Sequence, residues 1–262
     1  MHVESLAFRT DLELLRLSGS EVEDHGSYVA VRTPDNPTYY WGNFLLLPHA
    51  PTTEDLPEWI ERFGATYPRS RHLAFGVDGP DGTLDDLEPF RVAGLDVDAS
   101  SVMTATAVHE PARPNLEATY RPLAGDDDWH QQLELGIAGE HEESGRDFVV
   151  AKTASERALS GRGIGTWWGA FIGDRLLASM GLFAVSPGLA RFQQVKTHPD
   201  ARGRGLAGTL VHRVSQYGFA ELDARTLVMV ADPDYLAIRI YRSVGFDSTE
   251  TQLQAERKPA TD

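Results

Sequence analysis

The sequence predicts a mixed α/β fold, in which helices flank a sheet of parallel and antiparallel strands. Two strand-like runs in the second half, Ile164–Phe171 and Leu176–Val185, are joined by the turn-forming residues Gly173 and Asp174, which is typical of a β-hairpin. A third strand, a helix, a buried strand and a second helix then follow. Strands that precede alternating helices and strands imply a mixed sheet covered by helices.

Each later element has its own signal. Ala190–Thr197 is the third strand, and Thr226–Val230 has the apolar character of a buried strand. The last helix is predicted from about Asp234 to Val244. The helix between the two strands is predicted from about Gly205 to Leu222, and its apolar face is formed by Leu206, Leu210, Val211, Val214 and Tyr217.

A polar segment with two prolines, residues 109–115, separates two apolar regions and is predicted to be a linker. After it, the chain restarts with a short strand, a turn and a helix that opens on Asp126–Asp128. The chain has 262 residues, enough for two domains of about 130 residues each. We therefore predict one domain at residues 1–113 and a second at 114–262.

The first half repeats part of the plan of the second. Phe90–Leu95 (FRVAGL) resembles Tyr241–Phe246 (YRSVGF), and an alternating strand pattern follows both. His72–Val77 and residues 42–47 are strand-like, but an acidic helix without a glycine-rich turn comes next. The first half is predicted to be a repeat unit without the phosphate-binding part; a chance match of this length is the alternative.

Composition excludes several classes. The hydrophobic fraction of 41% and charged fraction of 24% are ordinary for a soluble globular protein. No run of about 18 apolar residues indicates a membrane span, and the first residues do not resemble a secretory signal. The chain has no cysteine, which excludes disulfides, thiolate metal sites and cysteine nucleophiles. We expect a cytoplasmic protein.

The net charge of −15 argues against nucleic acid as a partner, because phosphate binding relies on basic surface. The charge favours a cationic small molecule such as an amine, although acidic surfaces also serve solubility alone. No group of side chains has metal-ligand spacing, so no metal is expected.

The most informative stretch is Gln194–Gly208, in which a strand ends, a short loop follows and a helix opens within glycines. Glycine permits positive φ and close backbone approach. Several N–H groups can then converge on an anion at the positive end of the helix dipole. Arg202 and Arg204 add positive charge, so a diphosphate is the predicted ligand; for Arg204 a solvated loop position is the alternative.

A rival interpretation is a dinucleotide-binding fold, because Gly203-x-Gly205-x-x-Gly208 matches its fingerprint and Asp232 ends the next strand. That fold places its first glycine directly at the strand end, whereas His198–Arg202 intervene here. It also requires several further parallel strands, and only 30 residues follow Asp232. The context therefore argues against it.

Two motifs carry a family resemblance. Arg202-x-x-Gly205-x-Ala207, after a strand that ends in VKTHP at 195–199, resembles the acetyl-CoA-binding signature of the GNAT superfamily of acyltransferases. The second GNAT signature is matched by Asp234, Ala237, Tyr241, Gly245 and Phe246 at the expected distance. The resemblance extends from about Ala118 to the C-terminus. It implies a GNAT acyl-CoA N-acyltransferase fold, in a tandem form whose first unit has lost its cofactor loop.

The resemblance also implies the cofactor and its ligands. Acetyl-CoA is the expected co-substrate, its diphosphate held by backbone amides of the turn and its pantetheine arm by the strand backbone. Asp234 stands where the family usually has asparagine; it can cap a helix, but an ionised carboxylate only accepts hydrogen bonds. The expected cofactor-binding residues are Val195, Thr197, Arg202, Gly203, Arg204, Gly205, Leu206, Ala207, Gly208, Asp234 and Tyr241.

For the chemistry, the resemblance implies direct attack of a neutral amine on the thioester, with Tyr241 as the general acid for the leaving thiolate; the alternative is that Tyr241 only packs. The strand before the turn has no carboxylate to act as a base. Glu140, Glu142 and Glu143 are candidates to bind a cationic amine, with plain exposed charge as the alternative. Trp167 and Trp168 are adjacent on a strand and should point to opposite faces.

The main hypothesis is acetyl transfer from acetyl-CoA to a primary amine of a small molecule. The alternative is a non-catalytic acyl-CoA-binding sensor or regulatory module, and a nicotinamide-binding oxidoreductase is a third. A monomer is favoured over a homodimer, since a tandem pair can bury the surface that single-domain relatives use to dimerise.

Overall fold

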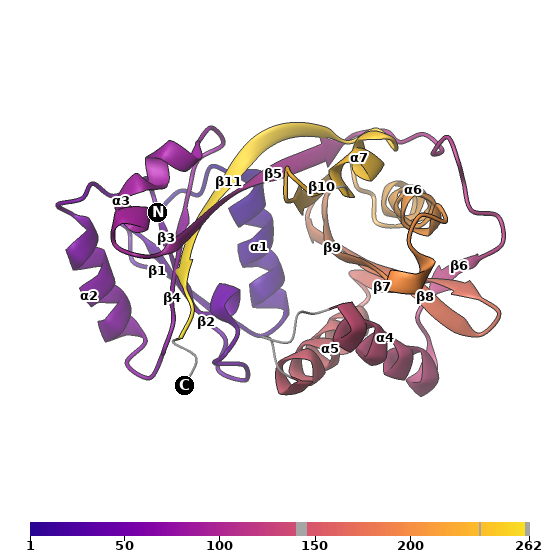
Figure 1. Cartoon of the computed structure of the whole chain (residues 1–262), viewed down its shortest axis with the longest axis horizontal. Coiled ribbons are helices and arrows are strands. Elements are labelled where there is room, and N and C mark those ends of the chain that lie inside the picture. Colours follow the sequence, from indigo (N-terminus) through magenta and orange to yellow (C-terminus); the bar gives the residue numbers. More distant parts are fainter. Residues whose placement is uncertain (140–145, 236, 260–262) are drawn as a thin grey trace. The chain divides into compact units, whose positions relative to one another are not determined.

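The computed structural model of the chain describes residues 1–139, 146–235 and 237–259. Its internal contacts divide the chain into two compact units. The first unit contains Met1–Val102, Val230–Pro233 and the segment that begins at Thr249, and the second contains Met103–Met229 and Asp234–Ser248 (Figure 1). The mixed α/β fold is confirmed. The units differ from the predicted ranges 1–113 and 114–262, because the last strand pairs inside the first unit.

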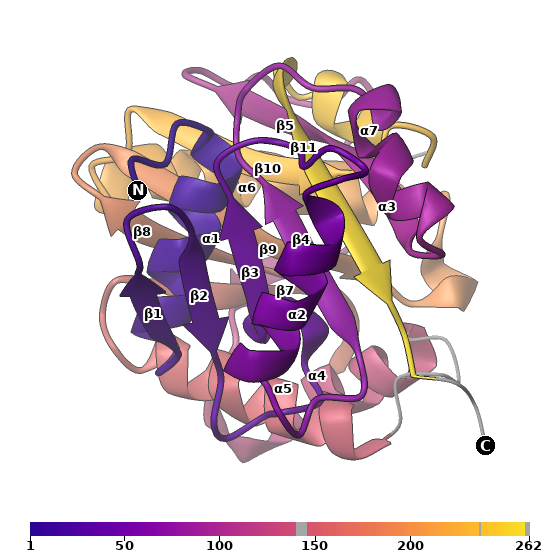
Figure 2. The same ribbon diagram turned by 90° about the vertical axis from the view of Figure 1, so that its left-hand side faces the viewer.

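The first unit contains a sheet with the strand order β1-β2-β3-β4-β11-β5. Strands β3 and β4 run parallel, while β1–β2, β2–β3 and β4–β11 are antiparallel. Helix α2 lies in front of this sheet in Figure 2. The elements are α1 (Leu6–Leu17), β1 (Glu21–Asp24), β2 (Val29–Arg32), η1 (Tyr40–Gly42), β3 (Phe44–Leu47), α2 (Leu56–Thr66), β4 (Leu73–Val77), η2 (Leu84–Leu87), α3 (Glu88–Val92), β5 (Asp96–Ala105), whose end belongs to the second unit, and β11 (Asp247–Arg257), which begins in the second unit.

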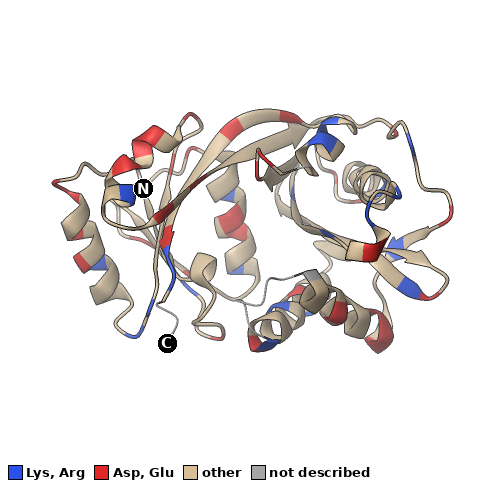
Figure 3. Ribbon diagram, in the orientation of Figure 1, with Lys and Arg blue, Asp and Glu red and all other residues tan. Residues whose placement is uncertain are grey.

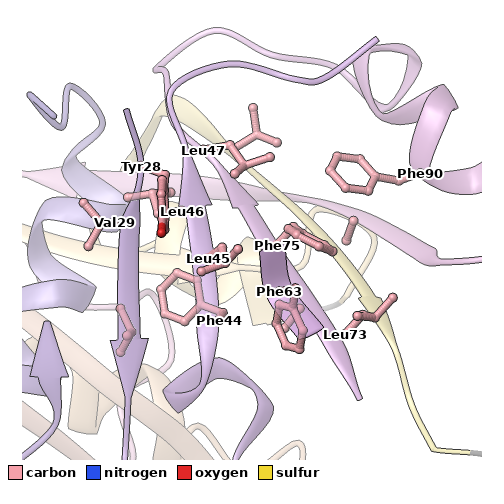
Figure 4. Close-up of a cluster of buried hydrophobic side chains, with 14 of the residues drawn as sticks. Tyr28, Val29, Phe44, Leu45, Leu46, Leu47, Phe63, Leu73, Phe75 and Phe90 are labelled. Carbon is pink, nitrogen blue, oxygen red and sulfur yellow. The ribbon is translucent and has the colours of Figure 1, made fainter. Parts of the chain in front are cut away.

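The core of the first unit is apolar and closely packed around β3 and β4. All four residues of β3 are buried (Figure 4). At Gly76, in the middle of β4, an added Cβ would lie 2.6 Å from the ring of Phe8 and 3.0 Å from Leu46. Side chains from α1 and β3 therefore fill the volume beside β4, and the interior of this unit is occupied by its own residues.

The second unit contains a sheet with the order β10-β9-β8-β7-β6. Strands β9 and β10 are parallel and the other pairs are antiparallel. Helix α6 covers one face, and α4 and α5 cover the other (Figure 1). The elements are β6 (Thr119–Pro122), α4 (Gly125–Gly139), α5 (Arg146–Ser160), β7 (Gly165–Ile172), β8 (Arg175–Ser186), β9 (Leu189–Thr197), η4 (Pro199–Ala201), α6 (Leu206–Glu221), β10 (Thr226–Ala231), whose end belongs to the first unit, and α7 (Ala237–Arg242).

The adjacent tryptophans of β7 point to opposite faces, as predicted. The ring of Trp168 lies 5.4 Å from that of Tyr217 on α6. Trp167 is 2% exposed, and its ring lies 5.7 Å from that of Phe183. Trp168 thus packs against helix α6, while Trp167 is buried against the neighbouring strand β8.

Charged residues are spread over both units: Figure 3 shows lysine and arginine positions on helices, strands and loops. Among the described residues, no helix is long and apolar enough to cross a membrane.

Candidate active site

A β-bulge interrupts β9 before it reaches the glycine turn. Gln193 pairs with Gly181 of β8 and Lys196 with Ser179, so two residues of β9, Gln194 and Val195, face a single residue of β8. Gln194 has a positive φ of 33°, a conformation that non-glycine residues adopt rarely. Bulges bend a strand and redirect its backbone groups, and they are frequent beside active sites.

Beyond this point β9 is paired on one side only. Its parallel pairing with β10 covers three positions and ends at Val228–Arg191, while pairing with β8 continues to Thr197–Ala178. The N–H of His198 donates to the carbonyl of Leu177 on the same side. Because backbone groups alternate along an antiparallel pair, those of Thr197 point away from β8, toward the side that β10 has left. This edge can hydrogen-bond an extended amide chain.

The glycine turn connects β9 to α6. Gly203 and Gly205 have φ values of +74° and +75°, in the left-handed region that glycine adopts without strain. Gly205 is the N-cap of α6, and no side chain caps the helix there. The N–H groups of Leu206, Ala207 and Gly208 precede the first intrahelical bond, in which Thr209 donates to the carbonyl of Gly205 at 3.1 Å. Uncapped N–H groups at a helix N-terminus form a site for an anion.

The two arginines of the turn lie in different environments. Arg202 is exposed. Arg204 donates to Glu117 at 2.8 Å, and both side chains are largely exposed. Of the two positive charges predicted beside the turn, one is therefore paired with an acidic residue that follows the linker, Glu117.

The linker itself packs on the turn, which the sequence did not predict. An added Cβ at Gly205 would lie 2.6 Å from the carbonyl oxygen of Arg113. The Nδ2 of Asn115 donates to the carbonyl of Arg204 at 2.9 Å. In the sequence, Asn115 is only one polar residue of a polar segment. Nothing in its neighbouring residues predicts that it contacts the glycine turn.

The second predicted motif surrounds α7. This helix runs from Ala237 to Arg242 and is therefore shorter than the predicted range of about Asp234 to Val244. Gly245, with a φ of +112°, follows the end of this helix. Asp234 is exposed and lies before the helix. The side chain of Ile240 would be 3.4 Å from a Cβ at Gly208, so Gly208 permits close packing of α6 against α7.

Tyr241 is 6% exposed, and burial raises the pKa of its phenol above the usual value, with a further contribution from Tyr235. Among the residues described, its hydroxyl has no hydrogen-bond partner. A phenol with a raised pKa stays protonated at neutral pH, as a general acid must. Tyr241 and the turn belong to the same unit, and α6 and α7 are in contact.

The three glutamates predicted to bind the acceptor, Glu140, Glu142 and Glu143, lie outside the described residues. In the part of the chain that the structure describes, no group of three His, Asp or Glu side chains could hold a metal ion.

Residues 131–246 match the model of the acetyltransferase (GNAT) family. This range contains both motifs, and it spans less than half of the chain. No curated protein sequence matches the chain at a significant level.

Several solved structures share the fold over nearly the whole chain. A conserved protein of unknown function from Staphylococcus epidermidis has a TM-score of 0.74 at 12% identity, covering 92% of this chain and 95% of its own. A GCN5-related N-acetyltransferase from Kribbella flavida has a TM-score of 0.67 at 12% identity, with 96% and 95% covered. A tandem GNAT protein from the clavulanic acid biosynthesis pathway has a TM-score of 0.56 at 11% identity, with 98% and 97% covered.

Proposed function

We propose that the protein transfers an acetyl group from acetyl-CoA to a primary amine of a small molecule, since residues 131–246 match the model of the acetyltransferase (GNAT) family and the fold resembles that of a GCN5-related N-acetyltransferase. One observation carries the proposal. In a single unit, a strand edge that has lost its neighbour leads into a glycine turn whose helix has no side-chain cap. An extended amide arm followed by a diphosphate fits this arrangement.

The residues present fit such a co-substrate. The N–H groups of Leu206, Ala207 and Gly208 would bind the diphosphate, with Arg202 as the nearby cation. The outward-facing backbone of Thr197 would orient the pantetheine amides. The bound co-substrate supplies a thioester carbonyl that a neutral amine attacks directly, forming the amide C–N bond as the C–S bond breaks.

Tyr241 would hold the proton that the departing sulfur needs. Burial keeps its phenol protonated, and proton donation by a placed side chain contributes about 10²–10⁴-fold to a rate. The ammonium proton of the attacking nitrogen would leave to water, since β9 carries Arg191 and Gln193 rather than a carboxylate in this neighbourhood. The acidic balance of the chain favours an amine acceptor that is cationic before it loses its proton.

The first test is isothermal titration of the full chain with acetyl-CoA, CoA and NADH. We expect one site per chain for both CoA species and no heat with NADH. A panel of primary amines, followed by release of free thiol, then tests turnover. CoA binding without thiol release across the panel would support a non-catalytic acyl-CoA-binding module, and absence of CoA binding would refute the proposed function.

A further inference from the structure

Residues 113–118, called the strap below, comprise the end of the predicted linker and the three residues after it, and hydrogen bonds of Asn115 hold this segment against the glycine turn. The backbone N–H of Asn115 donates to Oγ1 of Thr209 at 2.8 Å, and its side-chain Nδ2 donates to the carbonyl of Arg204 at 2.9 Å. One residue of the strap therefore contacts both the turn and the first turn of α6.

Asn115 is itself fixed in place. Its Oδ1 accepts from the N–H groups of Glu117 at 3.1 Å and Ala118 at 2.9 Å, and its carbonyl accepts from the hydroxyl of Tyr120 at 3.1 Å. Every polar atom of Asn115 thus has a partner, so its Nδ2 is held in one orientation.

Thr209 extends these contacts to the next carbonyl. Its side chain is buried, at 3% exposed, and its Oγ1 donates to the carbonyl of Gly205 at 3.0 Å. The carbonyls of Arg204 and Gly205 are therefore both bound, one by the strap and one within α6. A peptide plane whose carbonyl is held back directs its N–H to the opposite side, which is the orientation an anion site requires.

We propose that Asn115 is a positioning residue of the diphosphate site: by binding the carbonyl of Arg204, it keeps the partial negative charge of that carbonyl turned away from the phosphate oxygens. This inference rests on the proposed function. It assigns to the strap, which belongs to the second unit, a role in cofactor affinity.

The test compares two thioester donors that differ in the diphosphate. Asn115→Ser keeps an oxygen that can accept from the backbone N–H groups of the strap, adds no charge, and removes the donor to Arg204. Loss of a hydrogen bond that fixes the backbone of a binding turn weakens binding of the ligand by about tenfold. We expect the KM and Kd for acetyl-CoA to rise about tenfold, while kcat/KM for S-acetylpantetheine, which lacks the diphosphate, is unchanged.

Two further variants separate positioning from folding. Thr209→Val removes the hydroxyl that accepts from the N–H of Asn115 and should reproduce the loss of acetyl-CoA affinity. Thr209→Ser keeps a hydroxyl and should bind acetyl-CoA as tightly as wild type. Leu116→Ser is the matched control in the strap, because Leu116 is 82% exposed.

The outcomes are distinct. If the wild-type chain does not bind CoA, the proposed function fails and this inference falls with it. If wild type binds CoA but Asn115→Ser binds equally well, the inference alone is overturned. Equal losses with both donors, accompanied by a lower Tm, would also overturn it, because they would show a purely structural role.

Discussion

The two units each contain a parallel strand pair joined by a helix, and the two pairs end differently. In the first unit, β3 pairs with β4 up to its last residue, Leu47, and the N–H of Asp78 continues the ladder to the carbonyl of Leu47 at 2.8 Å. In the second unit, β9 pairs with β10 only over its first three residues. A ligand with peptide-like groups can add beside the second pair, because among the described pairings that of β9 with β10 stops at Arg191 while β9 continues to Thr197.

The helices that follow these strands, α2 and α6, also differ in how well their first turns could bind an anion. The first turn of α2 contains Pro57, which has no N–H, and the acidic residue Glu58. The first turn of α6 contains neither proline nor an acidic residue. An anion would meet a missing donor and a like charge at α2, but three N–H groups that precede the first intrahelical bond at α6.

The segments Phe90–Leu95 and Tyr241–Phe246 share a backbone hydrogen bond but differ in their first side chain. Leu95 donates to the carbonyl of Phe90 at 3.0 Å, and Phe246 donates to that of Tyr241 at 3.2 Å. A glycine with positive φ precedes each donor, Gly94 at +78° and Gly245 at +112°. The predicted repeat therefore has a counterpart in local structure, and the first unit carries a phenyl ring where the second carries a phenol.

The largest expected effect tests whether the two halves are separable. A fragment of residues 1–113 lacks β11, whose Leu253–Arg257 pairs with all of β4 and buries Leu253 and Ala255. We expect this fragment to aggregate rather than unfold cooperatively, because β4 becomes an unprotected edge. Size-exclusion chromatography and thermal unfolding measure this, and a peptide of residues 247–259 should improve solubility. A monomeric fragment with a sharp transition would show that β11 is dispensable.

Tyr241→Phe makes the second unit resemble the first at this position. We expect kcat to fall about 100-fold, the magnitude of a lost general acid, with unchanged Tm, since the hydroxyl has no hydrogen bond among the described residues. The raised pKa of Tyr241 further predicts no loss of activity through its ionisation up to about pH 10, because the acid form persists there. Full activity in Tyr241→Phe would leave Tyr241 as a packing residue.

How much of this comparison the sequence predicts depends on how local each feature is. The hairpin at Gly173, the helix that follows Gly205 and the Tyr241 motif depend on neighbouring residues, and all lie close to where they were expected. The bulge at Gln194 and the end of pairing at Val228 depend on partners distant in the sequence. For the same reason the sequence does not show that Asn115 contacts the turn, or that β11 completes the first unit.

The two glycines of the turn should differ in sensitivity. Gly205→Ala brings a Cβ to 2.6 Å from the backbone of Arg113, in addition to the strain of a positive φ, whereas a Cβ at Gly203 meets nothing within 4 Å. The left-handed conformation alone costs an alanine about 1 kcal/mol; if the free turn relaxes to avoid this strain, binding must restore it and the affinity falls about fivefold. We expect Gly203→Ala to weaken acetyl-CoA binding by about that factor and Gly205→Ala by at least about thirtyfold, as measured by titration calorimetry. Equal losses of affinity in the two variants would mean that the strap moves aside from a Cβ at position 205 at little cost.

The smallest effect concerns the ion pair that joins the strap to the turn. Arg204 and Glu117 are 42% and 59% exposed, so their pair contributes little to stability. Removing the carboxylate in Glu117→Gln takes a negative charge from beside the diphosphate site and releases Arg204 toward it. We therefore expect Kd for acetyl-CoA to fall about twofold to threefold at low ionic strength and to match wild type at about 0.5 M salt, where screening is strong. Weaker binding in this variant would instead show that Glu117 orients Arg204, and the strap would then act on the site through charge as well as through Asn115.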